Sequence, residues 1–420
     1  MSLTEAQVVA AEIERVDPTV AVLFDRDSTF YSQIEKGQVE IVSKRDMRVP
    51  LEMRPGGNFG GFLPDGGDLG LGDAPSYDKG LLPTVDMRIA IQWNKQTEWS
   101  TDDKRKAVIN TFQRNMASAM AEFRRQVDSQ CMTDGTGTLG TITTVGTSGA
   151  NDVYTLTTDG FGARLMRYGQ KVNVYATGLG TRRTTGEGAK ILFYDLPNKQ
   201  IQVLTADVTA AVATDKLVVS GPTTTPPVWL LGVPYHHNSA STGSWLGLDR
   251  ATNPEIRANR VTASTGFALP FARLAMNKIG DRVGLDNTYD CEAWMHPCQI
   301  QAYEEYGQSI SIINKDGMKE QGLNQYFSDN MQMAGAPVKK SFSWDKTRID
   351  FICKSIWKRA EMHKAGFYKS SDGRRMFELR GSSGGVAAAD IFYLCVSFNL
   401  YVTNPAACAY ISDLTVPSGY

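Results

Sequence analysis

The stretch TDDKRKAVINTFQRNMASAMAEFRRQVDSQCM, residues 101–132, is the longest segment of helical periodicity in the chain and contains no Gly or Pro. Ser100 or Thr101 can cap its first turn, two aspartates in that turn complement the helix dipole, and Gly135 follows its end. We therefore predict one long helix, about 45 Å at a rise of about 1.5 Å per residue. Its apolar side chains recur every three or four residues and should form one buried stripe: Val108, Phe112, Met116, Met120, Phe123, Val127 and Cys131.

A long hairpin with a tip rich in Gly and Pro is predicted ahead of this helix, over residues 39–99. Its strand-like flanks are 39–53 and 84–93. A structureless loop of more than about twenty residues is rare inside a compact domain, unless it works outside its own subunit. The tip carries the apolar residues Phe59, Phe62, Leu63, Leu69 and Leu71. Because such side chains need a surface to bury against, the tip predicts contact with another protein.

The pattern changes after the helix, where short β-rich runs alternate with turns over residues 138–235. We interpret this region as a small β-barrel or sandwich inserted as a unit of its own. Its candidate strands are DVYTLTT, KVNVYAT, AKILFYD, KQIQVLT and KLVVSG.

Helical and strand patterns are mixed again from residue 265 onward, so the predicted fold class is α+β. Helices are expected over 269–283 and 297–306, and a polar loop over 314–335. The expected strands are 289–295, 338–342, 349–354, 375–380 and 391–402.

Composition sets broad limits on the class of protein. The chain has 420 residues, an apolar fraction of 42% and a formal charge of -1, which suits a globular protein and argues against one that coats nucleic acid with its whole surface. No apolar run has the length of a membrane span, and the N-terminus lacks the basic region of a secretory signal. We therefore expect a cytoplasmic protein without membrane contact.

The six cysteines form no C-x-x-C pair and lie among apolar residues. This pattern predicts reduced, mostly buried thiols and no disulfide framework. They are Cys131, Cys291, Cys298, Cys353, Cys395 and Cys408.

The order of the predicted elements is an arm, a Gly-rich hairpin, a long helix, a β insertion, an α/β region and returning strands. This order resembles the major capsid protein of tailed bacteriophages, whose fold is named after phage Hong Kong 97. Three phrases are also similar to that family: GTGTLGTITT at 135–144, SWLGLDRATNPEIRANRV at 244–261 and NLYVTNPAACAYISDL at 399–414. The resemblance covers nearly the whole chain.

The resemblance implies a division of the chain into seven parts. These are an N-terminal arm (1–38), an extended loop hairpin (39–99), the spine helix of a peripheral domain (100–134), an inserted β-barrel domain (135–235), a return to the peripheral domain (236–264), an axial domain (265–337), and the peripheral-domain sheet with the C-terminus (338–420). The chain departs from the family in having no long charged coiled coil at its N-terminus to act as a fused scaffold. Its β insertion is found in only some members.

The function implied by the resemblance is structural. The chain would self-assemble as hexamers and pentamers into an icosahedral head around double-stranded DNA, in the host cytoplasm, and remain in the virion. Implied partners are scaffolding, portal and decoration proteins, and DNA bound without sequence specificity. Two other classes stay open: an encapsulin-like compartment shell with an enzyme cargo, and a β-rich enzyme or binding module.

Charge gives a second argument for subunit contact. The hairpin tip is acidic through Asp65, Asp68 and Asp73, whereas residues 337–380 carry a net charge of +7. We hypothesise that the acidic tip docks on part of this basic stretch in an adjacent subunit, with charge setting the register. A solvated face of little energetic effect and a contact with DNA phosphates are the competing interpretations. The candidate partner surface is Lys339, Lys340, Lys346, Arg348, Arg374 and Arg375.

No catalytic, cofactor or metal site is expected. His236 and His237 have no carboxylate or Cys at ligand spacing, so we interpret them as surface-loop residues. Cys291, His296 and Cys298 lack a fourth ligand, and strand parity places Cys291 and His296 on opposite faces. The Gly-rich runs at 184–190 and 381–385 lack the pattern of a phosphate-binding loop and are predicted to be turns.

Overall fold

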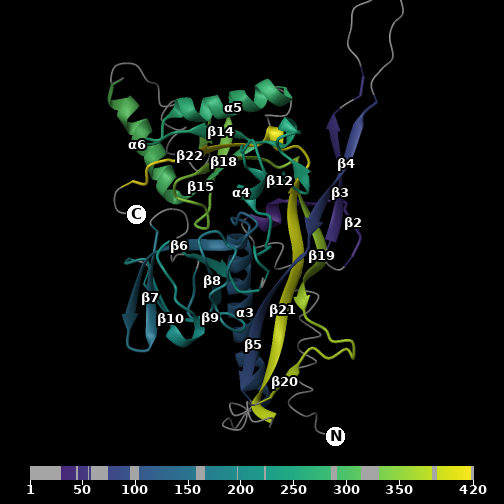
Figure 1. Ribbon diagram of the computed structural model, residues 1–420, viewed down its shortest axis with the longest axis vertical. Helices are drawn as coiled ribbons and strands as arrows, with labels where there is room; N and C mark the ends of the chain where they lie inside the picture. The colour runs from purple at the N-terminus through teal and green to yellow at the C-terminus, as the bar shows by residue number, and fades with distance from the viewer. Residues whose placement is uncertain are drawn as a thin grey trace, which may run out of the picture.

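The chain has an α+β fold, in which two β-sheets with their helices are joined to a β-barrel and a β-hairpin (Figure 1). The computed structural model describes residues 30–43, 46–54, 56–57, 74–94, 104–157, 166–195, 197–221, 224–284, 291–313, 331–380 and 386–417. Residues 1–29 of the predicted arm and residues 58–73 of the predicted hairpin tip lie outside this set.

The predicted long helix is confirmed as α3 (Lys104–Gln130). Met116, Met120, Phe123, Val127 and Cys131 are all at most 5% exposed and belong to the largest apolar core. The side chains of the other two predicted stripe positions, 108 and 112, are not among those described. After the helix, Gly135 has φ +90°, a conformation that favours glycine, and a Cβ there would lie 2.9 Å from Leu231. The stripe therefore buries α3 against the sheet described next.

A five-stranded sheet packs on this face of α3. Its strands are β1 (Glu35–Lys36), β19 (Trp357–Phe367), β21 (Val386–Val402), β20 (Phe377–Arg380) and β5 (Val85–Asn94). β21 is the predicted strand 391–402 extended at its start, and it pairs with β5 from Ala389↔Asn94 to Phe398↔Val85. β19 was not predicted because charged residues interrupt its apolar pattern. Two of them, Arg359 and Glu361, are at most 9% exposed and paired at 3.0 Å.

A six-stranded sheet with two helices forms a second core. Its order is β14 (Asn259–Thr262), β22 (Ala409–Ser412), β18 (Ile349–Cys353), β15 (Cys291–Met295), β17 (Ala336–Lys340) and β16 (Gln332–Met333). The helices are α5 (Leu269–Val283), whose predicted bounds are confirmed, and α6 (Pro297–Ile313), which continues past its predicted end. Side chains from α5 and from these strands share one apolar cluster, so this part has its own core.

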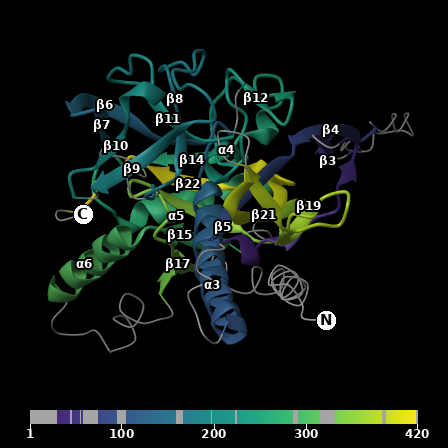
Figure 2. The same ribbon diagram turned by 90° about the horizontal axis from the view of Figure 1, so that it is seen from below.

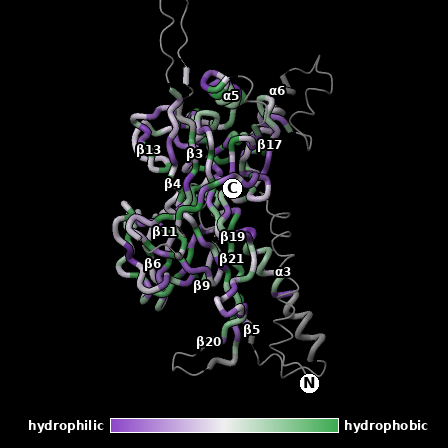
Figure 3. Tube along the Cα trace, turned by 90° about the vertical axis from the view of Figure 1, so that its right-hand side faces the viewer, coloured by the Kyte–Doolittle hydropathy of each residue, from purple (hydrophilic) through white to green (hydrophobic). Residues whose placement is uncertain are grey.

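The predicted insertion is confirmed as a closed barrel. Its strands are β6 (Thr138–Ser148), β7 (Asn151–Leu156), β8 (Lys171–Tyr175), β9 (Ala189–Asp195), β10 (Gln200–Leu204) and β11 (Lys216–Val219). Inward residues alternate along the strands; Ile201 and Val203 are fully buried, whereas their neighbours on β10 are not. Figures 2 and 3 show the barrel and α3 on opposite sides of the long strands β19 and β21.

The predicted hairpin exists, but its returning strand was placed wrongly. β2 (Glu40–Ile41), β3 (Asp46–Arg54) and β4 (Ser76–Pro83) form a three-stranded sheet, in which β3 pairs with β4 from Asp46↔Pro83 to Arg54↔Ser76. The segment 84–93, predicted to return the hairpin, belongs instead to β5 of the five-stranded sheet. Turn-favouring residues between Ser76 and Gly80 suggested a loop, but they form the mostly exposed first half of β4.

The prediction that all six cysteines are reduced is wrong for one pair. Cys291 on β15 lies directly opposite Cys353 on β18, with Cα atoms 3.9 Å apart, and the two form a disulfide. Their separation of 62 residues gives no local sequence signal. Cys131, Cys298 and Cys408 are buried thiols, as predicted.

Candidate assembly surfaces

The hairpin is fixed to the body by its inner face. Met47, Val49 and Leu51 of β3 and Leu82 of β4 are at most 3% exposed and share a cluster with Trp245. Trp245 belongs to β12 (Ser244–Trp245), which is joined by a turn to β13 (Leu248–Asp249). The Leu81 amide donates to the Leu246 carbonyl at 2.8 Å, so the base of the hairpin is held by both apolar contact and backbone hydrogen bonding.

The outer face of the hairpin is exposed. Tyr77 is 69% exposed and Leu81 48%, and these two residues share one face of β4 because they are four positions apart. Arg48, the cross-strand neighbour of Leu81, lines a groove of about 370 Å³ together with Lys79 and Glu40. Figure 1 shows β3 and β4 along one edge of the molecule. The face therefore combines apolar side chains with charged groups of both signs at the edge of the molecule.

The predicted loop residues lie outside the described residues. Phe59, Phe62, Leu63, Asp65, Asp68, Leu69, Leu71 and Asp73 all fall between β3 and β4, so the structure describes only the strands that carry them.

The six predicted basic residues are not brought together. Lys339 and Lys340 lie on β17, Lys346 and Arg348 on the connection to β18, and Arg374 and Arg375 just before β20. Figure 3 shows β17 near one end of the molecule and β20 near the other. Lys339 lies 4.0 Å from Glu292, and Arg348 is engaged in a buried cluster. A single docking surface could thus use only part of the set.

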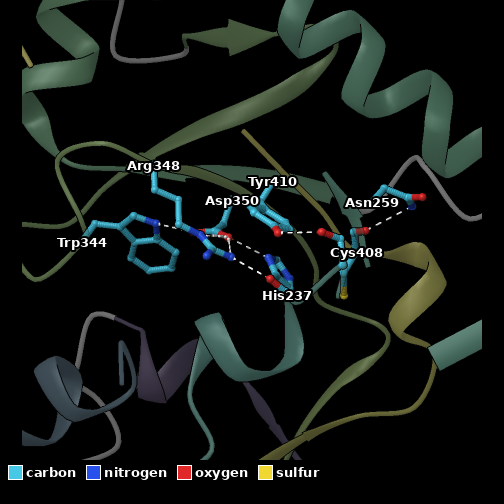
Figure 4. Close-up of polar contacts among 8 residues, drawn as sticks. His237, Asn259, Trp344, Arg348, Asp350, Cys408 and Tyr410 are labelled. Atoms are coloured by element: carbon cyan, nitrogen blue, oxygen red, sulfur yellow. Dashed lines mark hydrogen bonds and ion pairs between the residues drawn. The ribbon is translucent and has the colours of Figure 1, made fainter. Parts of the chain in front are cut away.

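The buried cluster is centred on Asp350 of β18 (Figure 4). Its carboxylate accepts hydrogen bonds from Arg348 Nε at 2.8 and 3.0 Å and from Trp344 Nε1 at 2.9 Å. It also lies 2.8 Å from Nδ1 of His237, the residue that follows α4 (Val233–His236). Arg348 stacks over the Tyr410 ring at 4.1 Å. The cluster therefore ties the segment after the barrel to three parts of the six-stranded sheet.

The ionisation of this cluster follows from its contacts. Burial alone would raise the pKa of Asp350, but the Arg348 charge and the hydrogen bonds from His237 and Arg348 lower that pKa to about 2. Burial lowers the pKa of His237. His237 is therefore neutral at pH 7, and its Nδ1–H donates to the Asp350 carboxylate.

The prediction that His236 and His237 are surface residues is wrong, since both are at most 1% exposed. Trp245 Nε1 donates to His236 Nδ1 at 3.1 Å, so the opposite nitrogen, Nε2, carries the proton and donates to the Leu400 carbonyl at 3.0 Å. Burial lowers the pKa of His236 to about 3. Their partners are distant in sequence, 113 residues for His237 and 164 for His236, which is why local spacing could not reveal them.

The three residues considered for a metal are used in other contacts. Cys291 is in the disulfide, and His296 Nδ1 accepts a hydrogen bond from the Cys298 amide at 3.1 Å. Within the described part of the chain, no group of three His, Cys, Asp or Glu side chains is arranged to hold a metal ion. Among the same residues, no helix is long and apolar enough to cross a membrane.

The structure is similar to chains in solved structures of phage and GTA particles. The cyanophage A-1(L) capsid has a TM-score of 0.48 and 11% identity, covering 91% of this chain and 90% of that chain. The capsid of an empty GTA particle gives 0.46 and 12%, with 93% and 91% covered, and Gordonia phage Cozz gives 0.43 and 12%, with 92% and 86% covered. No family model and no curated protein matches the sequence.

Likeness at this level of identity concerns shape only.

Proposed function

We propose that the chain is a structural major capsid protein of the Hong Kong 97 type, which self-assembles into the icosahedral head of a tailed phage around double-stranded DNA. The observation that carries the proposal is the hairpin. Its inner face is buried on the body through Met47, Val49 and Leu51, whereas its outer face leaves Tyr77 and Leu81 exposed at the rim. An anchored strand pair with an uncovered apolar face is typical of a protein–protein contact.

The two apolar cores would correspond to the two domains of the capsid fold. α3 and the five-stranded sheet would be the peripheral domain, and the six-stranded sheet with α5 and α6 the axial domain that meets its copies at the five- and six-fold positions. The hairpin would be the extended loop that lies across a neighbour. The barrel would be the insertion present in some members of the family.

Assembly would be driven by many modest contacts for each subunit. Each contact is weak enough to be corrected during growth, and the closed shell is stable because every subunit is held by several neighbours. Scaffolding, portal and decoration proteins would be the partners, and DNA would be held through phosphates without sequence specificity. No catalytic step is part of this role.

The outer face of the hairpin provides the test. The double substitution Tyr77→Glu and Leu81→Glu places two charges on the proposed contact without touching the inner face. We expect a folded subunit, by circular dichroism, that forms no shells in electron micrographs. The matched control is Val212→Glu on the barrel, where the residue is 47% exposed and the change should leave assembly intact.

Two results would contradict the proposal. The first is shell formation by the double variant at the level of the unsubstituted chain. The second is equal loss of shells in the double variant and in the Val212→Glu control, because the hairpin face would then have no special role.

A further inference from the structure

Residues 30–37, named the anchor segment below, insert two aromatic side chains into the body of the protein. Phe30 is 2% exposed and makes edge-on contacts with Trp294 at 5.2 Å, Trp344 at 5.5 Å and Trp357 at 6.2 Å between ring centroids. Trp294 and Trp344 stack on each other at 5.3 Å. Trp294 belongs to β15 of the six-stranded sheet and Trp357 to β19 of the five-stranded sheet. Phe30 therefore fills the space where the two sheets meet.

Tyr31 is held by polar contacts and by one aromatic ring. Its hydroxyl donates to Glu361 Oε1 at 2.8 Å, and its carbonyl accepts from Arg359 Nη1 at 3.1 Å. The Arg359 guanidinium lies 4.3 Å from the centre of the Tyr31 ring, and Phe398 packs edge-on against that ring at 4.7 Å. The amides of Phe30 and Tyr31 both donate to Asp128 Oδ1 of α3, at 3.3 and 3.1 Å. Asp128 is only 7% exposed, so these amides are partners for a buried carboxylate.

The rest of the segment binds as an added strand. β1 (Glu35–Lys36) pairs in parallel with Lys358 and Arg359 of β19, and the Gly37 amide donates to the Arg359 carbonyl at 2.9 Å. Ile34 is buried, at 4% exposed. A Cβ at Gly37 would overlap the Tyr401 ring, so only glycine allows this close approach.

The receiving surface comes entirely from other parts of the chain, namely α3, β15, β19, β21 and the turn after β17. The segment contributes the buried aromatic side chains of Phe30 and Tyr31, the buried side chain of Ile34 and the short parallel strand β1. This is the pattern by which peptides bind through strand addition and side-chain pockets.

We propose that this surface is a peptide-binding site whose ligand is the chain's own anchor segment, with the pattern Phe-Tyr-x-x-Ile-x-x-Gly. Binding of the segment links the position of the N-terminal arm to the junction of the two sheets. Its withdrawal would leave an apolar cavity beside the three tryptophans and remove two amide donors from Asp128. The inference does not depend on the proposed capsid role.

The test cuts the covalent link and asks whether the segment stays. A site for a sequence-specific protease is inserted between Gln38, which is exposed, and Val39 in the full chain. After cleavage we expect fragment 1–38 to co-elute with the body in size-exclusion chromatography and the tryptophan fluorescence to be unchanged. A synthetic peptide of residues 27–38 in excess should displace the fragment. The Phe30→Ala peptide should compete at least about a hundredfold less well, since Phe→Ala in a core is costly.

A surface substitution supplies the matched control. Glu35 is 74% exposed in its side chain and pairs with Lys358 at 2.6 Å, so Glu35→Gln should leave the peptide's competition within a few fold. Release of the fragment from a folded body on cleavage would overturn the proposal, as would equal competition by the Phe30→Ala peptide. Because every peptide competes for the same cleaved body, the chain with the inserted protease site is the one variant that has to fold.

Discussion

At the scale of single residues, the structure concentrates its buried charge around Asp350. The carboxylate accepts hydrogen bonds from Arg348, Trp344 and His237, which come from the turn before β18 and from the segment after α4. Removing one member of such a buried set costs more than losing an exposed ion pair, because the remaining groups stay buried without a partner.

We therefore expect Asp350→Ala to lower the free energy of unfolding by at least about 3 kcal/mol. Glu187→Ala serves as the control, because Glu187 and its partner Lys171 have side chains 81% and 47% exposed and such an exposed pair should contribute little to the free energy of unfolding. Urea unfolding of the two variants measures both values. Equal losses would show that the Asp350 cluster carries no special share of the stability.

A second prediction at this scale concerns the stability of the protein at acidic pH. Burial lowers the pKa of His236 to about 3, below its usual value of 6.5, so the unfolded chain binds a proton that the folded chain does not. The contribution of His236 to the free energy of unfolding is therefore fully present above pH 6.5. As the pH falls from 6.5 toward 3, this contribution decreases by about 1.4 kcal/mol per pH unit.

The measurement is urea unfolding of the unsubstituted chain and of His236→Gln between pH 6 and 4. The difference in unfolding free energy between them should shrink by about 1.4 kcal/mol per pH unit as the pH falls, because only the unsubstituted chain has this histidine to protonate. A difference that does not change with pH would mean that His236 is not buried and neutral.

At the scale of elements, the sequence pattern was sufficient to predict a helix or strand that buries one face in the apolar core of its own part of the molecule. The bounds of α5 and the approximate positions of five barrel strands followed from periodicity and turn residues, whereas β6 was not among the predicted strands. β19 and the anchor segment were missed because their side chains depend on distant partners: Tyr31 meets Asp128 97 residues away and Glu361 330 residues away. The disulfide and the buried histidines escaped prediction for the same reason. No spacing rule within one element encodes such contacts.

The candidate site was predictable only in outline. The apolar and acidic residues of the hairpin tip indicated a contact outside the subunit, but the exposed pair on β4, Tyr77 and Leu81, was read as part of a loop. Of the predicted basic residues, Arg348 forms an ion pair with Asp350 of the same chain. Charge counting along a sequence cannot separate an internal partner from an external one.

The acidic tip of the hairpin gives a prediction at this scale. Reversing Asp65, Asp68 and Asp73 to lysine should slow or misdirect assembly, because the proposed partner stretch 337–380 carries a net charge of +7. Light scattering during assembly follows the rate, and its dependence on salt should be weaker in the variant. Unchanged assembly would remove the electrostatic part of the docking hypothesis and leave its apolar part.

At the scale of the whole molecule, the structure combines two cores, a barrel on one side and a hairpin at the rim. Each core has its own apolar cluster, and the anchor segment and the Asp350 cluster lie where the two sheets approach. A subunit built this way can keep its internal geometry while its rim contacts neighbours. This is what a shell made of many copies requires.

The most direct measurement is negative-stain electron microscopy of the chain, expressed together with the genes beside its own and followed by size analysis. We expect closed shells, roughly tens of nanometres across. DNA inside them would support the phage head, whereas a protein cargo would favour the compartment shell. Persistent monomers or small oligomers under these conditions would contradict the central claim.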